Sequence, residues 1–167
     1  MKKFNQLIGA MLACATALFL LAQPATAQSS RPASSAAKAE PKGADRTHRL
    51  ILQVNTNDPA MMNLALNNAA NVDQYYSDKG EPVEIEIVTF GPGLHMLRDD
   101  TSPVKDRVKS MAESRPSVTF KACGNTQENM AKAENKKIPL VSQATVVKSG
   151  VVRVMELQEQ GWSYVRP

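Results

Sequence analysis

The chain has few of the side chains from which metal, redox and hydrolytic sites are usually built. Its 167 residues include 2 cysteines and 2 histidines, and the cysteines do not form a Cys-x-x-Cys pair. A zinc site needs clustered ligands, and a Cys–His hydrolase needs His48 or His95 beside Cys123, which nothing in the sequence indicates. A dinucleotide fingerprint and a phosphate-binding loop are also missing. We therefore expect no metal ion and no cofactor.

Residues 1–27 have the pattern of a secretory leader. Two lysines precede an uncharged apolar stretch over residues 7–22, and Ala25-Thr26-Ala27 supplies the small residues of a cleavage site. The alternative is an uncleaved membrane anchor, but the stretch is shorter than a normal membrane span. We expect a periplasmic or secreted protein with no stable membrane span once the leader is removed. Cys14 leaves with the leader, so Cys123 is the thiol that stays.

The composition changes again after the leader. Residues 28–47 are mostly Ser, Ala, Pro, Lys and Gln without a large apolar side chain, which cannot offset the entropy of ordering the backbone. We expect a flexible linker there and one domain over residues 48–167. The net charge of +4 comes from the leader and the linker, because basic and acidic residues are equal in number in the domain. The charge therefore gives no support for binding of nucleic acid by the folded part.

Apolar periodicity predicts a domain in which strands and helices alternate. Short runs rich in β-branched and aromatic residues indicate strands at residues 48–55, 83–90 and 118–120. Helical spacing of apolar residues indicates helices that begin at Pro59, at Ser102-Pro103 and after Asn125. Asp58 before Pro59 is a typical helix start.

The sequence after Lys137 admits two structures. Residues 145–147 and 151–154 could form a hairpin around a three-residue turn. Alternatively, a strand ends at Val147, Ser149 caps a helix that ends before Gly161, and a last strand covers 162–165. The alternation upstream favours the second version, since it is typical of a parallel sheet with helices on both faces.

Cys123 lies between a predicted strand and a predicted helix. Asn125 followed by Glu128 resembles a helix N-cap with its reciprocal carboxylate. The sulfur would then face unpaired backbone N–H groups and the positive end of the helix dipole, both of which favour the reactive thiolate. The alternative is a buried, inert cysteine that packs as a small apolar side chain.

Two neighbours of Cys123 are candidates for stabilising an anion. They are the backbone N–H groups that follow Gly124, including that of Asn125, and the ammonium group of Lys121. Lys121 could instead be a solvated charge at the edge of the sheet.

Other polar residues are expected near the same end of the sheet. In a doubly wound fold the ligand crevice lies beyond the carboxyl ends of the strands. Asn55, Asn57, Phe90-Gly91 and Ser149 follow predicted strands, so we expect them around the mouth that holds Cys123. Capping and turn formation are the alternative roles for each of these residues.

Three segments of the domain resemble the DsrE/DsrF-like family, in particular its exported, single-cysteine subgroup. They are Ala122-Cys123-Gly124-Asn125-Thr126, the run from Ser149 to Arg153, and the closing run from Glu156 to Pro167. The resemblance covers essentially the whole domain. It implies a three-layer α/β/α sandwich with a mainly parallel five-stranded sheet, in a flavodoxin-like arrangement, and it supports the helical version of residues 150–160.

The resemblance also implies a function. Characterised relatives carry sulfur as a cysteine persulfide and pass it between proteins, and Cys123 matches the family cysteine. The protein would be a sulfurtransferase or sulfur carrier that works with donor and acceptor proteins or with small persulfides. Relatives form trimers or hexamers, and Trp162 and Tyr164 offer an aromatic edge for such assembly. The leader would export the domain from the cytoplasm, so a role in the thiolation of transfer RNA is not expected.

Two classes of function therefore stay open. The first is a sulfur-relay protein in periplasmic sulfur metabolism with Cys123 as its working residue. The second is a non-catalytic ligand-binding or oligomeric assembly module in which Cys123 is structural.

Overall fold

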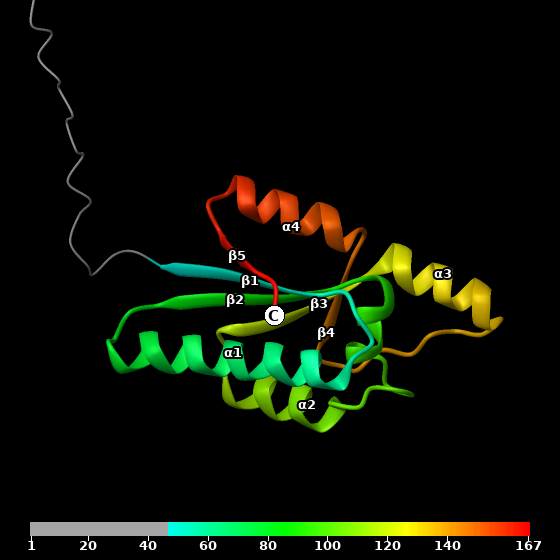
Figure 1. Ribbon diagram of the computed structural model, residues 1–167, viewed down its shortest axis with the longest axis horizontal. Coiled ribbons are helices and arrows are strands. Elements are labelled where there is room, and N and C mark those ends of the chain that lie inside the picture. Colours follow the sequence, from blue (N-terminus) through cyan, green and yellow to red (C-terminus); the bar gives the residue numbers. More distant parts are fainter. Residues whose placement is uncertain (1–46) are drawn as a thin grey trace, which may run out of the picture. The chain divides into compact units, whose positions relative to one another are not determined.

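The computed structural model describes residues 47–167, and the predicted leader and nearly all of the predicted linker lie outside them. Strands and helices alternate along the described chain (Figure 1). Their bounds are β1 His48–Val54, α1 Pro59–Asp78, β2 Val83–Thr89, the 3₁₀ helix η1 Gly91–Leu97, α2 Lys105–Ser114, β3 Val118–Cys123, α3 Gly124–Glu134, β4 Ala144–Val147, α4 Gly150–Glu159 and β5 Ser163–Val165.

The five strands form one parallel sheet in the order β4-β3-β2-β1-β5. Helices α1 and α2 lie on one face of the sheet and α4 on the other, while α3 continues from the end of β3 (Figure 1). The predicted α/β class, with helices on both faces of a five-stranded parallel sheet, is confirmed.

The main hydrophobic core lies between the sheet and the layer of α1, α2 and η1. Alternate residues of the strands point to this layer, as expected for strands covered on both faces. Glycine is required at position 93, because a Cβ there would lie 2.1 Å from the carbonyl oxygen of Val54. This close approach packs η1 against the end of β1.

A smaller core lies on the opposite face, under α4. It consists of Ile51 and Val88 from the sheet and Val154 and Leu157 from the helix, with Phe90 and Trp162 packed beside them. The helical version of the C-terminal region is thus confirmed and the hairpin is not formed. Apolar residues at positions 154 and 157 lie three apart, which is the spacing of one helix face.

Two local predictions about helix starts have different outcomes. Helix α1 begins as predicted, since Oδ1 of Asp58 accepts a hydrogen bond of 2.8 Å from the N–H of Ala60. Helix α2 begins at Lys105 rather than at Ser102-Pro103. Ser102 Oγ accepts from the N–H of Val104 and donates to the carbonyl of Met96, so it forms a turn before the helix. Within residues 47–167 no helix combines the length and apolar character that crossing a membrane requires.

Candidate functional site

Cys123 is the last residue of β3 and the N-cap residue of α3. The prediction that Asn125 caps the helix is wrong, because Asn125 already lies in the first helical turn. Its backbone N–H donates to the carbonyl of Lys148 over 3.1 Å, which ties this turn to the segment between β4 and α4. The helix therefore starts directly after the cysteine, two residues earlier than the sequence indicated.

The start of α4 also packs against Cys123. A Cβ on Gly150 would lie 3.2 Å from Cβ of Cys123 and 2.8 Å from Cδ1 of Phe90. Only a residue without a side chain fits this gap without a shift of its neighbours. The N-termini of α3 and α4 therefore both lie at Cys123. The cysteine is 4% exposed.

Groups that donate hydrogen bonds control the ionisation of the thiol. Burial raises the pKa of Cys123, but the Thr126 hydroxyl and the backbone N–H groups of Gly150, Thr126 and Asn125 lower it by more. The pKa therefore lies below the ordinary value for cysteine. Burial alone would raise the pKa of a thiol, and oriented hydrogen-bond donors around the sulfur lower it.

Strand order decides which predicted residues come near Cys123. The neighbours of β3 are β2 and β4, so Phe90-Gly91 and the residues after Val147 lie beside the cysteine. Asn55 follows β1, which is separated from β3 by β2. It lines a different, small cavity of about 20 Å³ together with the C-terminal Arg166 and Pro167. The structure thus does not bring Asn55 together with Cys123.

Lys121 and Ser149 take different places in this site. Lys121 lies two residues before Cys123 on β3 and shares its face of the sheet, but it is not among the main groups that shift the pKa of Cys123. Ser149 is the N-cap residue of α4, as predicted, although its side chain makes no capping hydrogen bond. Asn57 is an exposed residue before α1.

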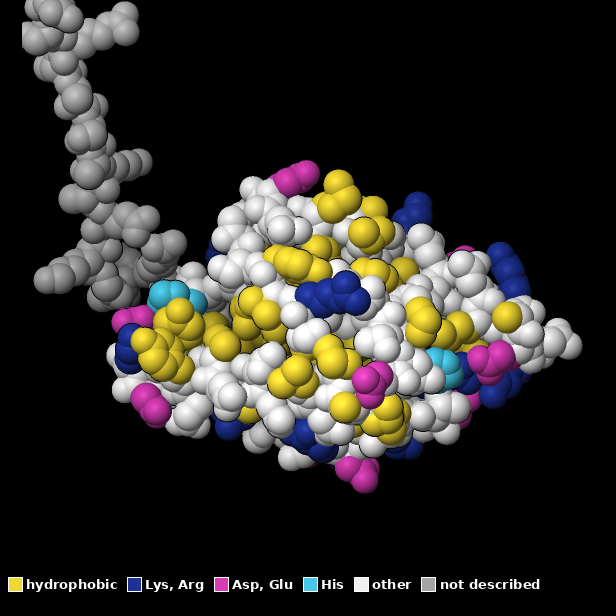
Figure 2. Space-filling view, in the orientation of Figure 1, with side chains coloured by type: hydrophobic (Ala, Val, Ile, Leu, Met, Phe, Trp, Pro, Cys, Tyr) yellow, Lys and Arg dark blue, Asp and Glu magenta, His cyan; other side chains and the backbone are white. Residues whose placement is uncertain are grey.

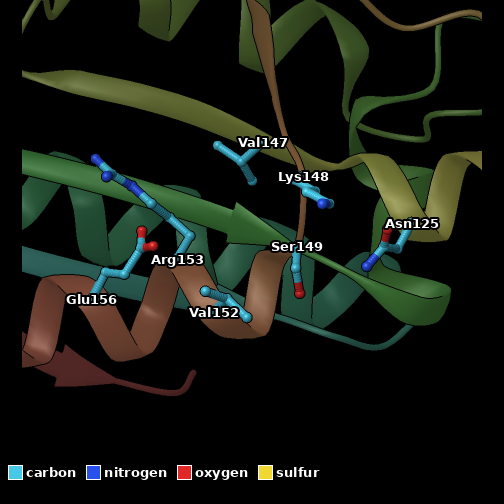
Figure 3. A pocket seen from close by; sticks show the side chains of 7 residues that line it. All are labelled: Asn125, Val147, Lys148, Ser149, Val152, Arg153 and Glu156. Carbon is cyan, nitrogen blue, oxygen red and sulfur yellow. The ribbon is translucent and has the colours of Figure 1, made fainter.

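An open groove of about 620 Å³ runs beside the cysteine. Figure 3 shows Asn125 at one end of this groove and Arg153 with Glu156 at the other. Val147, Lys148, Ser149 and Val152 complete the lining. Val147 is the register partner of Cys123, and Cys123 itself is not among the residues that line the groove.

The charges in the groove are partly neutralised. Arg153 donates two hydrogen bonds, of 2.6 and 3.0 Å, to the carboxylate of Glu86 in the sheet below. Lys148 forms no ion pair with any residue of the described chain. It is therefore the groove cation with the greatest freedom to meet an anion.

Neither histidine contacts the cysteine. Nε2 of His48 lies 2.8 Å from a carboxylate oxygen of Glu81, and the ring stacks on Tyr76. Nδ1 of His95 lies 2.9 Å from the hydroxyl of Thr101. Among residues 47–167 no cluster of three or more His, Cys, Asp or Glu side chains could hold a metal ion.

Sequence reasoning missed two features that position α3. Thr126 accepts a hydrogen bond of 3.0 Å from the N–H of Gly91, and the sequence pattern gave no signal for it because the helix cap was predicted at Asn125. The second feature is Arg98, which is 1% exposed and binds the carboxylates of Asp100 and Glu134. Periodicity does not reveal this cluster, because Glu134 lies 36 positions after Arg98 in the sequence.

These observations define a class of protein: a parallel α/β sandwich with one cysteine at the carboxyl edge of the sheet, where two helices begin. Among solved structures, five chains match. One is a protein of unknown function, MTH1491 from Methanobacterium thermoautotrophicum, with 29% sequence identity and a TM-score of 0.61. The match covers 72% of this chain and 99% of that one. No family model and no curated protein matches the chain.

Proposed function

We propose that the protein is a sulfur-relay protein, a sulfurtransferase or sulfur carrier of the DsrE/DsrF-like type, and that Cys123 holds the sulfur as a persulfide. The observation that carries the proposal is the position of Cys123, at the end of β3, where α3 begins directly after it and the start of α4 packs against it. A hydroxyl and three backbone N–H groups lower the pKa of Cys123 against the effect of burial. A structural cysteine needs no such donors, whereas a thiolate or persulfide anion does.

The proposed reaction is a transfer of sulfane sulfur without net oxidation. The Cys123 thiolate attacks the terminal sulfur of a donor persulfide, R–S–SH, and the S–S bond of the donor breaks. The products are Cys123–S–SH and the donor thiolate, R–S⁻, and the persulfide then loses its proton. An acceptor thiolate takes the same sulfur by the reverse steps and regenerates the Cys123 thiolate. Atoms and charge balance, and no oxidant or reductant is consumed.

The proposed setting follows from the leader pattern. The protein would act in the periplasm or outside the cell, with donor and acceptor proteins or small persulfides as partners and without nucleic acid. We also propose that it forms a homo-oligomer, a trimer or hexamer. Hydrophobic side chains come to the surface over α4 (Figure 2), where Val151, Val152 and Met155 are exposed. The edge strand β5 adds exposed Tyr164 and Val165.

Mass spectrometry of the mature chain tests the proposal. Incubation with inorganic polysulfide should add mass in steps of one sulfur atom, and a reductant should remove the added mass. Cys123→Ser is the matched control, since it changes one atom and should leave the fold intact. The proposal fails if wild-type protein takes up no sulfur while Cys123 reacts readily with a small alkylating agent.

The second candidate function is a non-catalytic binding or assembly module with a structural cysteine. The 4% exposure of Cys123 favours it, because a relay sulfur must be reached by a partner. Alkylation separates the two functions. A thiol that reacts with iodoacetamide only after unfolding, and that takes up no sulfur, would support the structural role.

A further inference from the structure

The groove beside α4 carries opposite charges at its two ends (Figure 3). Lys148 lies at the end marked by Asn125, while Arg153 and Glu156 lie at the other end. Within residues 47–167, neither Lys148 nor Glu156 forms an ion pair. Two hydrogen bonds hold Arg153 to Glu86, so these two charges cancel. One end of the groove is therefore positive, and the carboxylate of Glu156 makes the other end negative.

Helix α4 sets the distance between the two charged ends. Ser149 is its N-cap residue and directly follows Lys148 in the chain. Ser149, Val152 and Glu156 recur at intervals of three and four residues, so they share the helix face that lines the groove. Glu156 follows Ser149 by about two helical turns, which corresponds to about 10 Å along the helix axis.

The lining between the charged ends is apolar. It consists of Val147, the last residue of the edge strand β4, and Val152, which is 46% exposed. At the positive end the side chain of Ser149 makes no capping hydrogen bond, so its hydroxyl is available to a ligand. The volume of about 620 Å³ is in the range of small-molecule sites, about 300–1,000 Å³. The complementary ligand is anionic at one end, cationic at the other and small and apolar between them.

We propose that this groove binds a short peptide of small residues with free termini, its carboxylate at Lys148 and its amino group at Glu156. Three extended residues span about 10 Å, which matches the distance that α4 sets. The charged groups of a single amino acid are joined by one carbon atom and cannot reach both ends. The inference goes beyond the proposed sulfur relay, because no part of it uses Cys123.

Binding of trialanine to the full mature chain tests the proposal. In a nuclear magnetic resonance titration of isotopically labelled protein, trialanine should shift the backbone amide signals of Ser149 and Val152. Free alanine at the same concentration should not shift them. Trialanine amide lacks the carboxylate and acetyl-trialanine lacks the amino charge, so each should bind about threefold more weakly, the effect of losing one exposed ion pair. The proposal fails if trialanine shifts neither signal, or if the three peptides bind equally.

Two variants assign each terminus to its end of the groove. Lys148→Gln should bind trialanine and trialanine amide equally, and Glu156→Gln should bind trialanine and acetyl-trialanine equally. Lys132→Gln on α3 and Glu159→Gln on α4 are the matched controls, because both residues are exposed and lie outside the groove. They should keep the wild-type differences. Lys148→Gln or Glu156→Gln protein that still shows the full difference would overturn the assignment, and the peptide series on wild-type protein decides if a variant does not fold.

Discussion

Arg153 of α4 holds Glu86 of β2 by two parallel hydrogen bonds, although the two residues lie 67 positions apart in the sequence. Glu86 is 7% exposed and lies on the sheet face that α4 covers. This pair joins the helix to the sheet beside the small core of Ile51, Val88 and Leu157. The pair thus helps to hold α4 over the sheet, and with it Gly150 against Cys123.

We predict that Glu86→Gln destabilises the domain by about 2–3 kcal/mol, because it leaves the Arg153 guanidinium without its counter-charge in a partly buried place. Glu84→Gln is the matched control. Glu84 lies two residues earlier on the same strand and pairs with Arg49 in a solvent-exposed position, where the loss should stay below about 0.5 kcal/mol. Urea unfolding of both variants measures the difference, and equal midpoints would contradict the prediction.

Acid stability should depend on the cluster around Arg98. Arg98 and Lys136 lower the pKa of Glu134 to about 2 and also hold the pKa of Asp100 below its usual value. Carboxylates with a lowered folded-state pKa stabilise the fold above their unfolded pKa, and this contribution is lost as pH falls toward the folded value. For Glu134 the window runs from about pH 4.5 down to about pH 2.

We expect Glu134→Gln to flatten the loss of stability over that window, as measured by the urea midpoint between pH 7 and pH 2.5. Glu128→Gln, an exposed position on the same helix, is the control and should keep the wild-type slope. The interpretation fails if both variants lose stability with acid as steeply as wild type.

The sequence predicted the fold well where the signal is local. Strands such as β2 are recognisable from β-branched residues, and α1 from the cap at Asp58 and the proline after it. The C-terminal region allowed two local structures, and the alternation of the elements before it favoured the helix that the structure contains. Local patterns therefore predicted the types of element, with errors of a few residues at their ends, as at Lys105.

The site was harder to predict because it depends on contacts between distant segments. Asn125 has the side chain of a cap, but the hydrogen bond from its N–H to Lys148 belongs to the tertiary structure. Asn55 was expected near Cys123 because both follow strands, yet β2 separates those strands in the sheet. Thr126 depends on Gly91 in the same way. Strand order and these pairings are not encoded in the spacing of residues along one element.

Assembly through the edge strand β5 would bury side chains that are exposed in the single chain. Val165 is exposed on this edge, and a lysine there opposes pairing with a second strand. We predict that wild-type protein sediments as an oligomer at micromolar concentration and that Val165→Lys shifts it toward the monomer. Leu64→Lys, at an exposed position on α1, is the control and should not change the mass. A monomeric wild type would contradict the prediction.

Gly150 should be the least replaceable residue next to the cysteine. The Cβ of an alanine would lie 2.8 Å from the ring of Phe90 and 3.2 Å from Cβ of Cys123, so one of these side chains must move. We predict a loss of about 1–3 kcal/mol for Gly150→Ala, the usual effect of overpacking. Gly124→Ala, on the other side of the cysteine, is the comparison variant: its Cβ would lie 3.2 Å from the carbonyl oxygen of Val147, a tight contact but a milder one than 2.8 Å, so a smaller loss is expected. Because relief of these contacts loosens the packing around Cys123, Gly150→Ala should also speed alkylation of the thiol at a pH where it is fully ionised, and by more than Gly124→Ala does. Equal unfolding midpoints and equal alkylation rates for the two variants would show that the start of α4 does not control access to the sulfur.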